Sequence, residues 1–294
     1  SQQCLDFAGK LFLDPGDVVL CESPSYLGAL NAFNAYQPKF VEVPTDNGGL
    51  IPEELDKILS TTPNCKFIYV IPDFQNPTGR TWSMERRQKF MEVVNKHNLP
   101  VLEDNPYGEL RYEGTILPSL KSMDTKGLVM FLGTFSKIFC PGLRLGWIAA
   151  EHSLLSEFVK IKQSADLHTS NFDQGVADAY MEQYDLDAHV KEIVALYKHR
   201  RDLILESMEK YFPAGTEWTH PEGGLFLWLT FPEGVSARKV FNKCIEMKVA
   251  GVIGDAFYPN QKTDRSMRIN YSNMPDDRIV EGIQRMAKAI KECM

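Results

Sequence analysis

A lysine among hydroxyl residues marks the segment of this sequence best suited to covalent chemistry. Lys137 comes directly after Ser136 and three positions after Thr134, and Arg144 stands seven positions further on, with apolar runs on both sides. Loss of hydration lowers the pKa of an amine and exposes the lone pair that Schiff-base chemistry requires. The two hydroxyl groups and Arg144 could hold a dianionic phosphate by charge-assisted hydrogen bonds. A surface-loop lysine beside a helix-capping serine is the plain alternative.

Polar and aromatic side chains also follow three apolar segments that are predicted to be strands. Because the carboxyl ends of parallel strands meet at one edge of a sheet, where α/β proteins bind ligands, we expect these side chains to lie together. A helix predicted over residues 2–12 adds free backbone N–H groups at its start, which form a natural anion site. The residues are the N-cap Ser1, Tyr26 after strand 18–21, Asn76 after strand 66–71, and Asp104 and Tyr107 after strand 101–102.

Each of these residues also has a plain structural interpretation. Asn76 begins Asn-Pro-Thr-Gly, which is a good turn sequence by composition alone. Asp104 could cap a helix, and Tyr26 could be part of the core. The functional interpretation therefore depends on the residues acting as one set.

The elements that must position this set alternate between strand and helix. Apolar strands are predicted over 18–21, 39–43, 66–71 and 101–102, and apolar runs over 128–132 and 145–150 flank the Lys137 segment. Strands that are apolar on both faces, with helices between them, indicate a mainly parallel α/β sheet. The predicted helices of this part cover 2–12, 27–35, a segment opened by Pro52, and a segment capped by Ser83.

The pattern changes after residue 150. Residues 153–212 are predicted to be largely helical, with one long helix over 186–212 whose apolar face is interrupted by Arg201. Strands are predicted within 216–231 and over 267–271, and helices over 235–248 and from Pro275 onward. We therefore predict a large α/β domain over residues 1–190 and a smaller α+β domain over residues 191–294.

Composition narrows the class of protein. The 294 residues are 44% hydrophobic and 24% charged, as in an ordinary globular enzyme, and the formal net charge of -7 argues against nucleic acid or anionic membrane as a partner. No apolar run approaches the roughly 20 residues of a membrane span. The six scattered cysteines form no C-x-x-C pair, and the six histidines show no metal-ligand spacing. These observations predict reduced thiols in a cytoplasmic protein without a metal centre.

Taken together, the residues meet the needs of a single cofactor. Pyridoxal 5'-phosphate requires a lysine for its aldehyde, a carboxylate for its ring nitrogen, hydrogen bonds to its 3-oxygen, an aromatic face over the ring, and a phosphate cup. The sequence resembles the fold-type I pyridoxal-phosphate enzymes, specifically class I/II aminotransferases of the 2-aminoadipate/kynurenine aminotransferase-like branch. The motifs that carry the resemblance occur in the same order: S-Q-Q at 1–3, N-P-T-G at 76–79, E-D-x-P-Y at 103–107, and S-K-x-x-x-P-G-x-R-x-G at 136–146.

The resemblance implies catalytic roles for Lys137, Asp104 and Tyr107, with Asn76 beside them. Lys137 would bind the cofactor aldehyde covalently and then carry the proton that leaves the substrate α-carbon. Asp104 would keep the pyridine nitrogen protonated, and an opposite charge at this range commonly shifts a pKa by about 1–3 units. Asn76 and Tyr107 would donate hydrogen bonds to the phenolic oxygen.

The resemblance also assigns the binding residues. Tyr26 would stack on the cofactor ring, and the phosphate would be held by Ser1, Gln2, Thr134, Ser136 and Arg144. The segment from Ser266 to Ser272 matches the R-x-x-[FY]-S element of the family. Within it Arg268 would hold the substrate α-carboxylate in a bidentate fork, next to Asn76, and lysine could not replace that fork. A surface arginine on a strand is the plain alternative for Arg268.

The function implied is an aminotransferase that passes an amino group from an L-amino acid to a 2-oxo acid, 2-oxoglutarate by resemblance, in a ping-pong cycle. A homodimer is implied as well, since active sites of the family lie at the subunit boundary. Two alternatives remain open: the aminotransferase-like sensor domain of a winged-helix transcriptional regulator, and a lyase or decarboxylase on the same fold. Family members carry a glycine before S-Q-Q and a substantial segment ahead of it, so this chain is expected to be a truncated, cleaved or partial form. Asp73, Phe74 and Gln75 stand where related sequences vary and suggest no substrate.

Overall fold

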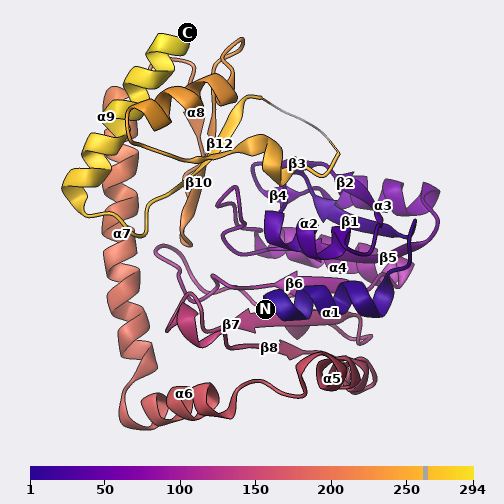
Figure 1. The fold of residues 1–294 in the computed structure, drawn as a ribbon. Helices are drawn as coiled ribbons and strands as arrows, with labels where there is room; N and C mark the ends of the chain where they lie inside the picture. The colour runs from indigo at the N-terminus through magenta and orange to yellow at the C-terminus, as the bar shows by residue number, and fades with distance from the viewer. Residues whose placement is uncertain (261–263) are drawn as a thin grey trace.

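A six-stranded sheet forms the centre of the first part of the chain in the computed structural model, which describes residues 1–260 and 264–294 (Figure 1). Its strand order is β2-β1-β5-β6-β7-β8, and every neighbouring pair is parallel except β7 and β8. The predicted mainly parallel sheet is confirmed. The strands are β1 (Val18–Glu22), β2 (Lys39–Val43), β5 (Cys65–Val70), β6 (Val101–Asp104), β7 (Val129–Thr134) and β8 (Gly146–Ala149).

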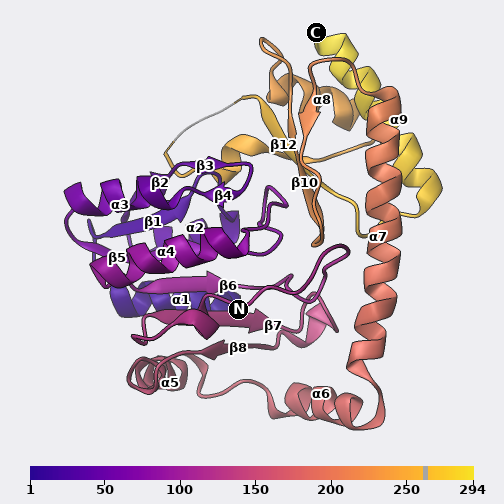
Figure 2. The same ribbon diagram turned by 180° about the vertical axis from the view of Figure 1, so that it is seen from behind.

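Helices cover both faces of this sheet because alternate residues of the buried strands point to opposite sides. On β5, Phe67 and Tyr69 pack toward α1, α2 and α5, whereas Ile68 and Val70 pack toward α3 and α4. Figure 2 shows α3 and α4 in front of the sheet and α1 behind it. The helices are α1 (Gln2–Phe12), α2 (Leu27–Asn34), α3 (Pro52–Thr61), α4 (Met84–His97) and α5 (His152–Asp166).

A second, antiparallel sheet with strand order β11-β12-β10-β9 organises the C-terminal part. Its inner face shares a core with α7, α8 and α9, in which the largest fully buried side chains include Phe231 and Tyr271. The strands are β9 (Glu217–Trp218), β10 (Phe226–Thr230), β11 (Val252–Ile253) and β12 (Ser266–Asn270), and the helices are α6 (Asn171–Gln183), α7 (Leu186–Tyr211), α8 (Ala237–Glu246) and α9 (Asp276–Cys293).

The long helix α7 runs beside both sheets (Figures 1 and 2). Its first half packs near the Phe74 loop through side chains such as Ile193 and Tyr197, and its second half joins the C-terminal core. Arg201, which interrupts the apolar face in the sequence, is buried and its guanidinium donates to the Pro221 carbonyl at 2.7 Å and to Asp202 at 2.7 Å. Arg201 is therefore a buried side chain that hydrogen-bonds α7 to the segment that contains Pro221.

Smaller elements complete the chain. A short hairpin joins β3 (Thr45–Asp46) to β4 (Gly49–Leu50), and the 3₁₀ helices are η1 (Lys121–Met123), η2 (Pro141–Leu143) and η3 (Gly254–Phe257). Ser83 caps α4 as predicted, with its side chain accepting from the Arg86 amide at 3.2 Å. Pro275 is the N-cap of α9 instead of its first residue, and α8 begins after the N-cap Ser236, two residues later than predicted.

Candidate active site

One cavity of about 380 Å³ collects every residue that the sequence nominated. It opens at the carboxyl ends of β5, β6 and β7 and is closed on one side by Arg268 from β12 of the second sheet. The nominated residues that line it are Ser1, Gln2, Tyr26, Asn76, Asp104, Tyr107, Thr134, Ser136, Lys137, Arg144 and Arg268.

Asp104 lies at the end of β6 and is 2% exposed. One carboxylate oxygen, Oδ2, accepts from the Tyr69 hydroxyl at 2.8 Å, while Oδ1 is buried and has no hydrogen-bond partner in the described part of the chain. Burial raises the pKa of Asp104 to about 6, because an ionised carboxylate loses its hydration there. The free oxygen can therefore receive one more donor, and a cationic donor would stabilise the ionised form.

Lys137 lies in the turn after β7 and is half-buried. Burial lowers its pKa, and the positive charges of Arg144 and Arg268 lower it further. The turn is held by Thr134, whose hydroxyl donates to the Leu145 carbonyl at 3.1 Å and accepts from the Ser136 amide at 3.1 Å. The lysine is thus fixed on a rigid turn and has a reduced affinity for its proton, as a nucleophilic amine needs.

Arg144 adopts a left-handed backbone conformation with φ of 56° at the end of η2. This turns its side chain back across the Lys137 loop, where its Nη1 donates to Pro141 O at 2.8 Å and to Ser136 Oγ at 3.4 Å. The guanidinium is exposed and retains donors for a further acceptor. Together with the hydroxyl groups of Thr134 and Ser136, Arg144 forms a positively charged part of the cavity wall that could bind an anion.

The start of α1 lies at the same part of the cavity wall. Ser1 is the N-cap, as predicted, but its side chain makes no capping hydrogen bond. Gln2 is fixed by donating to the Gly28 carbonyl at 2.8 Å and by accepting from the Tyr26 hydroxyl at 3.3 Å. Free N–H groups at a helix start, a free serine hydroxyl and Arg144 together suit a phosphate.

A hydrogen-bonded group joins the two sheets on the opposite side of the cavity. Arg268 Nη1 donates to Asn76 Oδ1 at 2.8 Å, and Asn76 Nδ2 donates to the Tyr107 hydroxyl at 3.4 Å. The Arg268 guanidinium lies 4.1 Å from the ring centre of Phe226 and 5.0 Å from that of Phe257. Arg268 Nε is buried and has no hydrogen-bond partner in the described residues, so the guanidinium retains a donor for a further acceptor such as a carboxylate.

The residues fit pyridoxal phosphate by criteria internal to the structure. The unpartnered oxygen of Asp104 matches a protonated ring nitrogen, the lowered pKa of Lys137 matches an aldehyde-binding amine, and the corner around Arg144 matches a dianion. These groups lie around one cavity, so a single molecule can reach all of them.

Sequence reasoning left four lining residues unassigned, namely Ile71, Pro106, Pro141 and Phe226. Phe226 belongs to strand β10 and packs in a core cluster with Tyr107. The signal for its second role is the pairing of β10 with β12, which brings the strand beside Arg268. The pairing of β10 with β12 joins segments that are distant in the sequence, so a local sequence pattern does not predict it.

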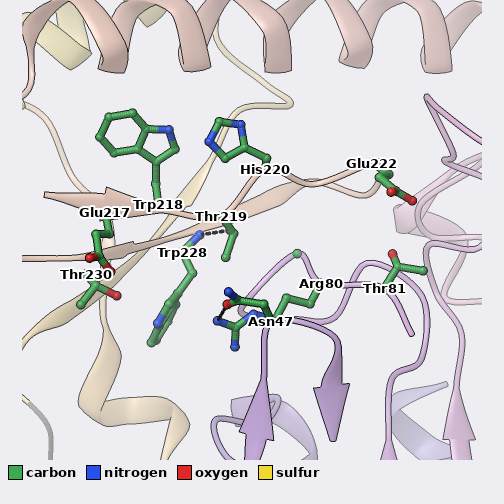
Figure 3. Close-up of a pocket in the computed structure, with 11 residues that line it drawn as sticks. Asn47, Arg80, Thr81, Glu217, Trp218, Thr219, His220, Glu222, Trp228 and Thr230 are labelled. Carbon is green, nitrogen blue, oxygen red and sulfur yellow. Dashed lines mark hydrogen bonds between the residues drawn. The ribbon is translucent and has the colours of Figure 1, made fainter. Parts of the chain in front are cut away.

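A second cavity, of about 480 Å³, holds none of the nominated residues (Figure 3). It lies between the turn that follows Asn76 and the strand β9, with Arg80 and Asn47 on one side and Thr219 on the other. Glu222 and Thr81 lie at the same end of it (Figure 3).

No group of three His, Cys, Asp or Glu side chains in the described ranges could hold a metal ion. No helix of the described residues is long and apolar enough to cross a membrane.

Fold, cavity and residue set together define a pyridoxal-phosphate transferase of fold type I. The sequence model of the family described as aminotransferase class I and II matches residues 1–286. The chain therefore belongs to the class I and II aminotransferases, and pyridoxal phosphate is its cofactor.

Individual relatives share most of the chain. Aromatic-amino-acid aminotransferase 1 of Thermococcus litoralis is 43% identical, in an alignment that takes in 100% of this chain and 72% of the relative. The crystal structure of Pyrococcus horikoshii kynurenine aminotransferase in complex with PMP is 43% identical, covers 99% of this chain and 73% of that one, and has a TM-score of 0.96. The alpha-aminoadipate aminotransferase of Thermus thermophilus, complexed with N-(5'-phosphopyridoxyl)-L-leucine, is 35% identical over 100% of this chain and 74% of that one, with a TM-score of 0.95.

Proposed function

We propose that this aminotransferase moves the amino group of an L-amino acid to a 2-oxo acid, with 2-oxoglutarate as acceptor, in a ping-pong cycle. The observation that carries the proposal is that one cavity joins an amine of lowered pKa, an unpartnered buried carboxylate oxygen and a ring-stacked guanidinium, from Lys137, Asp104 and Arg268. Bound pyridoxal phosphate supplies an aldehyde for the amino group and an electron-accepting ring. The chain supplies binding, orientation and proton transfer.

Lys137 and Asp104 do the work closest to the reacting atoms. Lys137 would hold the cofactor through its aldehyde, and as a neutral amine its Nζ would take up the proton that leaves the substrate α-carbon. Asp104 Oδ1 would accept from the ring nitrogen of the bound cofactor, while its other oxygen accepts from the Tyr69 hydroxyl. The carboxylate would thereby favour the protonated, positively charged form of the ring nitrogen.

The remaining residues fix the orientation of the cofactor. Asn76 and Tyr107 donate to the phenolic oxygen, and Tyr26 covers one face of the ring. The phosphate is held at the corner of the cavity where the start of α1 meets the Lys137 turn. The residues that bind it are Ser1, Gln2, Thr134, Ser136 and Arg144.

Arg268 binds the α-carboxylate of the substrate, with Asn76 beside it. We assign the donor to the larger amino acids with apolar or aromatic side chains, because the lining residues that no other role explains are apolar: Ile71, Pro106 and Pro141. Two of the relatives are named for aromatic amino acids and for kynurenine, which supports this class. A panel of amino donors with 2-oxoglutarate tests it, and a preference for small or acidic donors would overturn it.

A homodimer in the cytoplasm is part of the proposal. Exposed apolar side chains gather on α6 and the loop that precedes it, where Leu167 and Phe172 are 71% and 79% exposed. Such a patch is unusual for a monomer, and a second copy of the chain is the occupant we propose. All six cysteines are free, as in a reducing compartment. Sedimentation of the wild type and of Phe172→Glu tests the dimer, which fails if both are monomeric at all concentrations.

We also propose that residues 1–190 and 191–294 act as two domains with the active site between them.

The central test of the function is the visible absorbance of pyridoxal phosphate bound to the purified chain. Lys137→Ala should abolish the lysine-linked band, whereas Lys160→Ala, which alters an exposed i,i+3 ion pair on α5, should leave it intact. A wild-type chain without such a band would refute the cofactor role of Lys137. A chain that binds the cofactor but converts it to its amine form with none of the twenty amino acids would refute transamination.

A further inference from the structure

The loop that presents Asn76 is held by a buried charge network which also reaches the second sheet. Asp73 is 4% exposed, and its Oδ1 accepts from Arg87 Nη2 at 2.7 Å and from Arg111 Nη2 at 3.3 Å. Arg87 is fully buried, so its charge already neutralises Asp73. Arg111 places a second cation on the same carboxylate oxygen.

Arg111 contacts the segment just ahead of Asn76 in two ways. Its guanidinium bonds to Asp73 and lies 4.8 Å from the ring centre of Phe74. Phe74 has a left-handed backbone with φ of 50°, and its amide donates to the Thr81 hydroxyl at 3.2 Å. A large side chain in that conformation is strained unless its surroundings hold it. Arg111 is one of the groups that hold it.

Arg111 also reaches across to the loop between β9 and β10. Its Nη1 bonds to Glu222 Oε2 at 3.1 Å, and its backbone forms a bridge with Gly223. Gly223 approaches so closely that an added Cβ would lie 2.4 Å from a ring carbon of Phe74. The side chain of Arg111 is only 7% exposed, whereas that of Glu222 is 55% exposed at the rim of the second cavity (Figure 3).

We infer that Arg111 is a positioning residue that couples the β9–β10 loop to the orientation of Asn76, and through Asn76 to Arg268. The inference rests on the proposed function of Asn76 toward the cofactor. The contacts run from Glu222 through Arg111 to the Asp73–Phe74 segment, and Asn76 follows two residues later with Arg268 on its Oδ1. A movement of the second sheet relative to the first would therefore act on Asn76 in two ways, through the backbone segment ahead of it and through Arg268 on its Oδ1.

The test uses the spectrum of bound pyridoxal phosphate instead of turnover. Because Asn76 would donate to the phenolic oxygen, a looser Asn76 favours the protonated oxygen and raises the pH midpoint of the visible band. Arg111→Met is expected to raise the midpoint by about half a pH unit, since part of one hydrogen bond is lost. Glu222→Gln, at an exposed position where folding is not at risk, should shift it less and in the same direction.

Three variants make the test specific. Arg111→Lys retains the charge without the planar fork, so it should raise the midpoint by less than Arg111→Met does. Arg278→Met removes an exposed ion pair with Glu281 on α9 and should leave the midpoint unchanged. In an Asn76→Ala background, Arg111→Met should cause no further shift, because its effect passes through Asn76.

The outcomes separate this inference from the proposed function. An unchanged midpoint in both Arg111→Met and Glu222→Gln, in chains that bind the cofactor, overturns the positioning role alone. A shift that persists in the Asn76→Ala background also overturns it, since the effect then bypasses Asn76. A wild-type chain without a Lys137-dependent band refutes the proposed function and removes the basis of this inference with it.

Discussion

The substitution Asp104→Asn should separate the needs of catalysis from those of folding. Asp104 is buried and uses one oxygen for Tyr69 while the other has no partner in the described residues. Asparagine keeps the size of the side chain and the acceptor for Tyr69, but it removes the charge. Function and stability are then expected to change in opposite directions.

The size of each change follows from the environment of the carboxylate. Burial raises the pKa of Asp104 from 3.8 to about 6, so its stabilising contribution is present below pH 3.8 and is lost as the pH rises through 6. This rise in pKa corresponds to about 3 kcal/mol of destabilisation of the folded state at neutral pH. Asparagine carries no charge, so Asp104→Asn could recover up to this amount. Loss of the charge beside the ring nitrogen should lower the pKa of that nitrogen by about 1–3 units and slow the reaction about 10- to 1000-fold.

Two measurements test these expectations. Urea unfolding of the cofactor-free chain at neutral pH should show Asp104→Asn to be at least as stable as the wild type. Rapid mixing with an amino donor, followed in the visible band, should show the slower half-reaction. Tyr69→Phe is the matched control, because it removes only the hydrogen bond to Oδ2 and should slow the reaction by less. An Asp104→Asn variant that reacts at the wild-type rate would refute the assigned role.

Two further predictions concern the substrate clamp and a buried carboxyl group. Arg268→Lys should raise the KM of both the amino donor and the 2-oxo acid about 10- to 100-fold, because the bidentate fork is lost, and an unchanged KM would exclude this role of Arg268. Burial raises the pKa of Glu22 from 4.5 to about 7, so the stability it contributes is present below pH 4.5 and is lost as the pH rises through 7. In the wild type, the free energy of unfolding should fall between about pH 5 and about pH 8, and Glu22→Gln should make this fall smaller by about 2–3 kcal/mol. Denaturant titrations at the two pH values measure it. A fall of the same size in both chains would contradict the raised pKa of Glu22.

Much of the fold could be predicted because its local signals are strong. The apolar run at 66–71 became β5, Ser83 caps α4, and the long stripe over 186–212 became the single helix α7. Element ends were less predictable, since competing caps decide them. At the start of α9, Pro275 satisfies the N-cap position, and the helix begins one residue later than its proline suggested. The meaning of Arg201 also stayed hidden, because its partners Glu113 and Pro221 are distant in sequence.

The candidate site divides in the same way. The sequence alone nominated the residues that we propose for the chemistry, because Lys137, Asp104 and Asn76 each stand in a motif whose residue types admit few other uses together. Parallel strands place their carboxyl ends at one edge, so the meeting of these side chains from the first sheet followed from the strand pattern.

Only the tertiary structure decided what faces them from the second sheet. Arg268 reaches Asn76 because β12 pairs with β10 and the second sheet packs against the end of the first. The pairing that links Arg111 to Glu222 spans 111 residues, and no local pattern encodes such a contact. Long-range contacts depend on how apolar faces pack, which sequence spacing does not report, and they set the geometry in which the local motifs act.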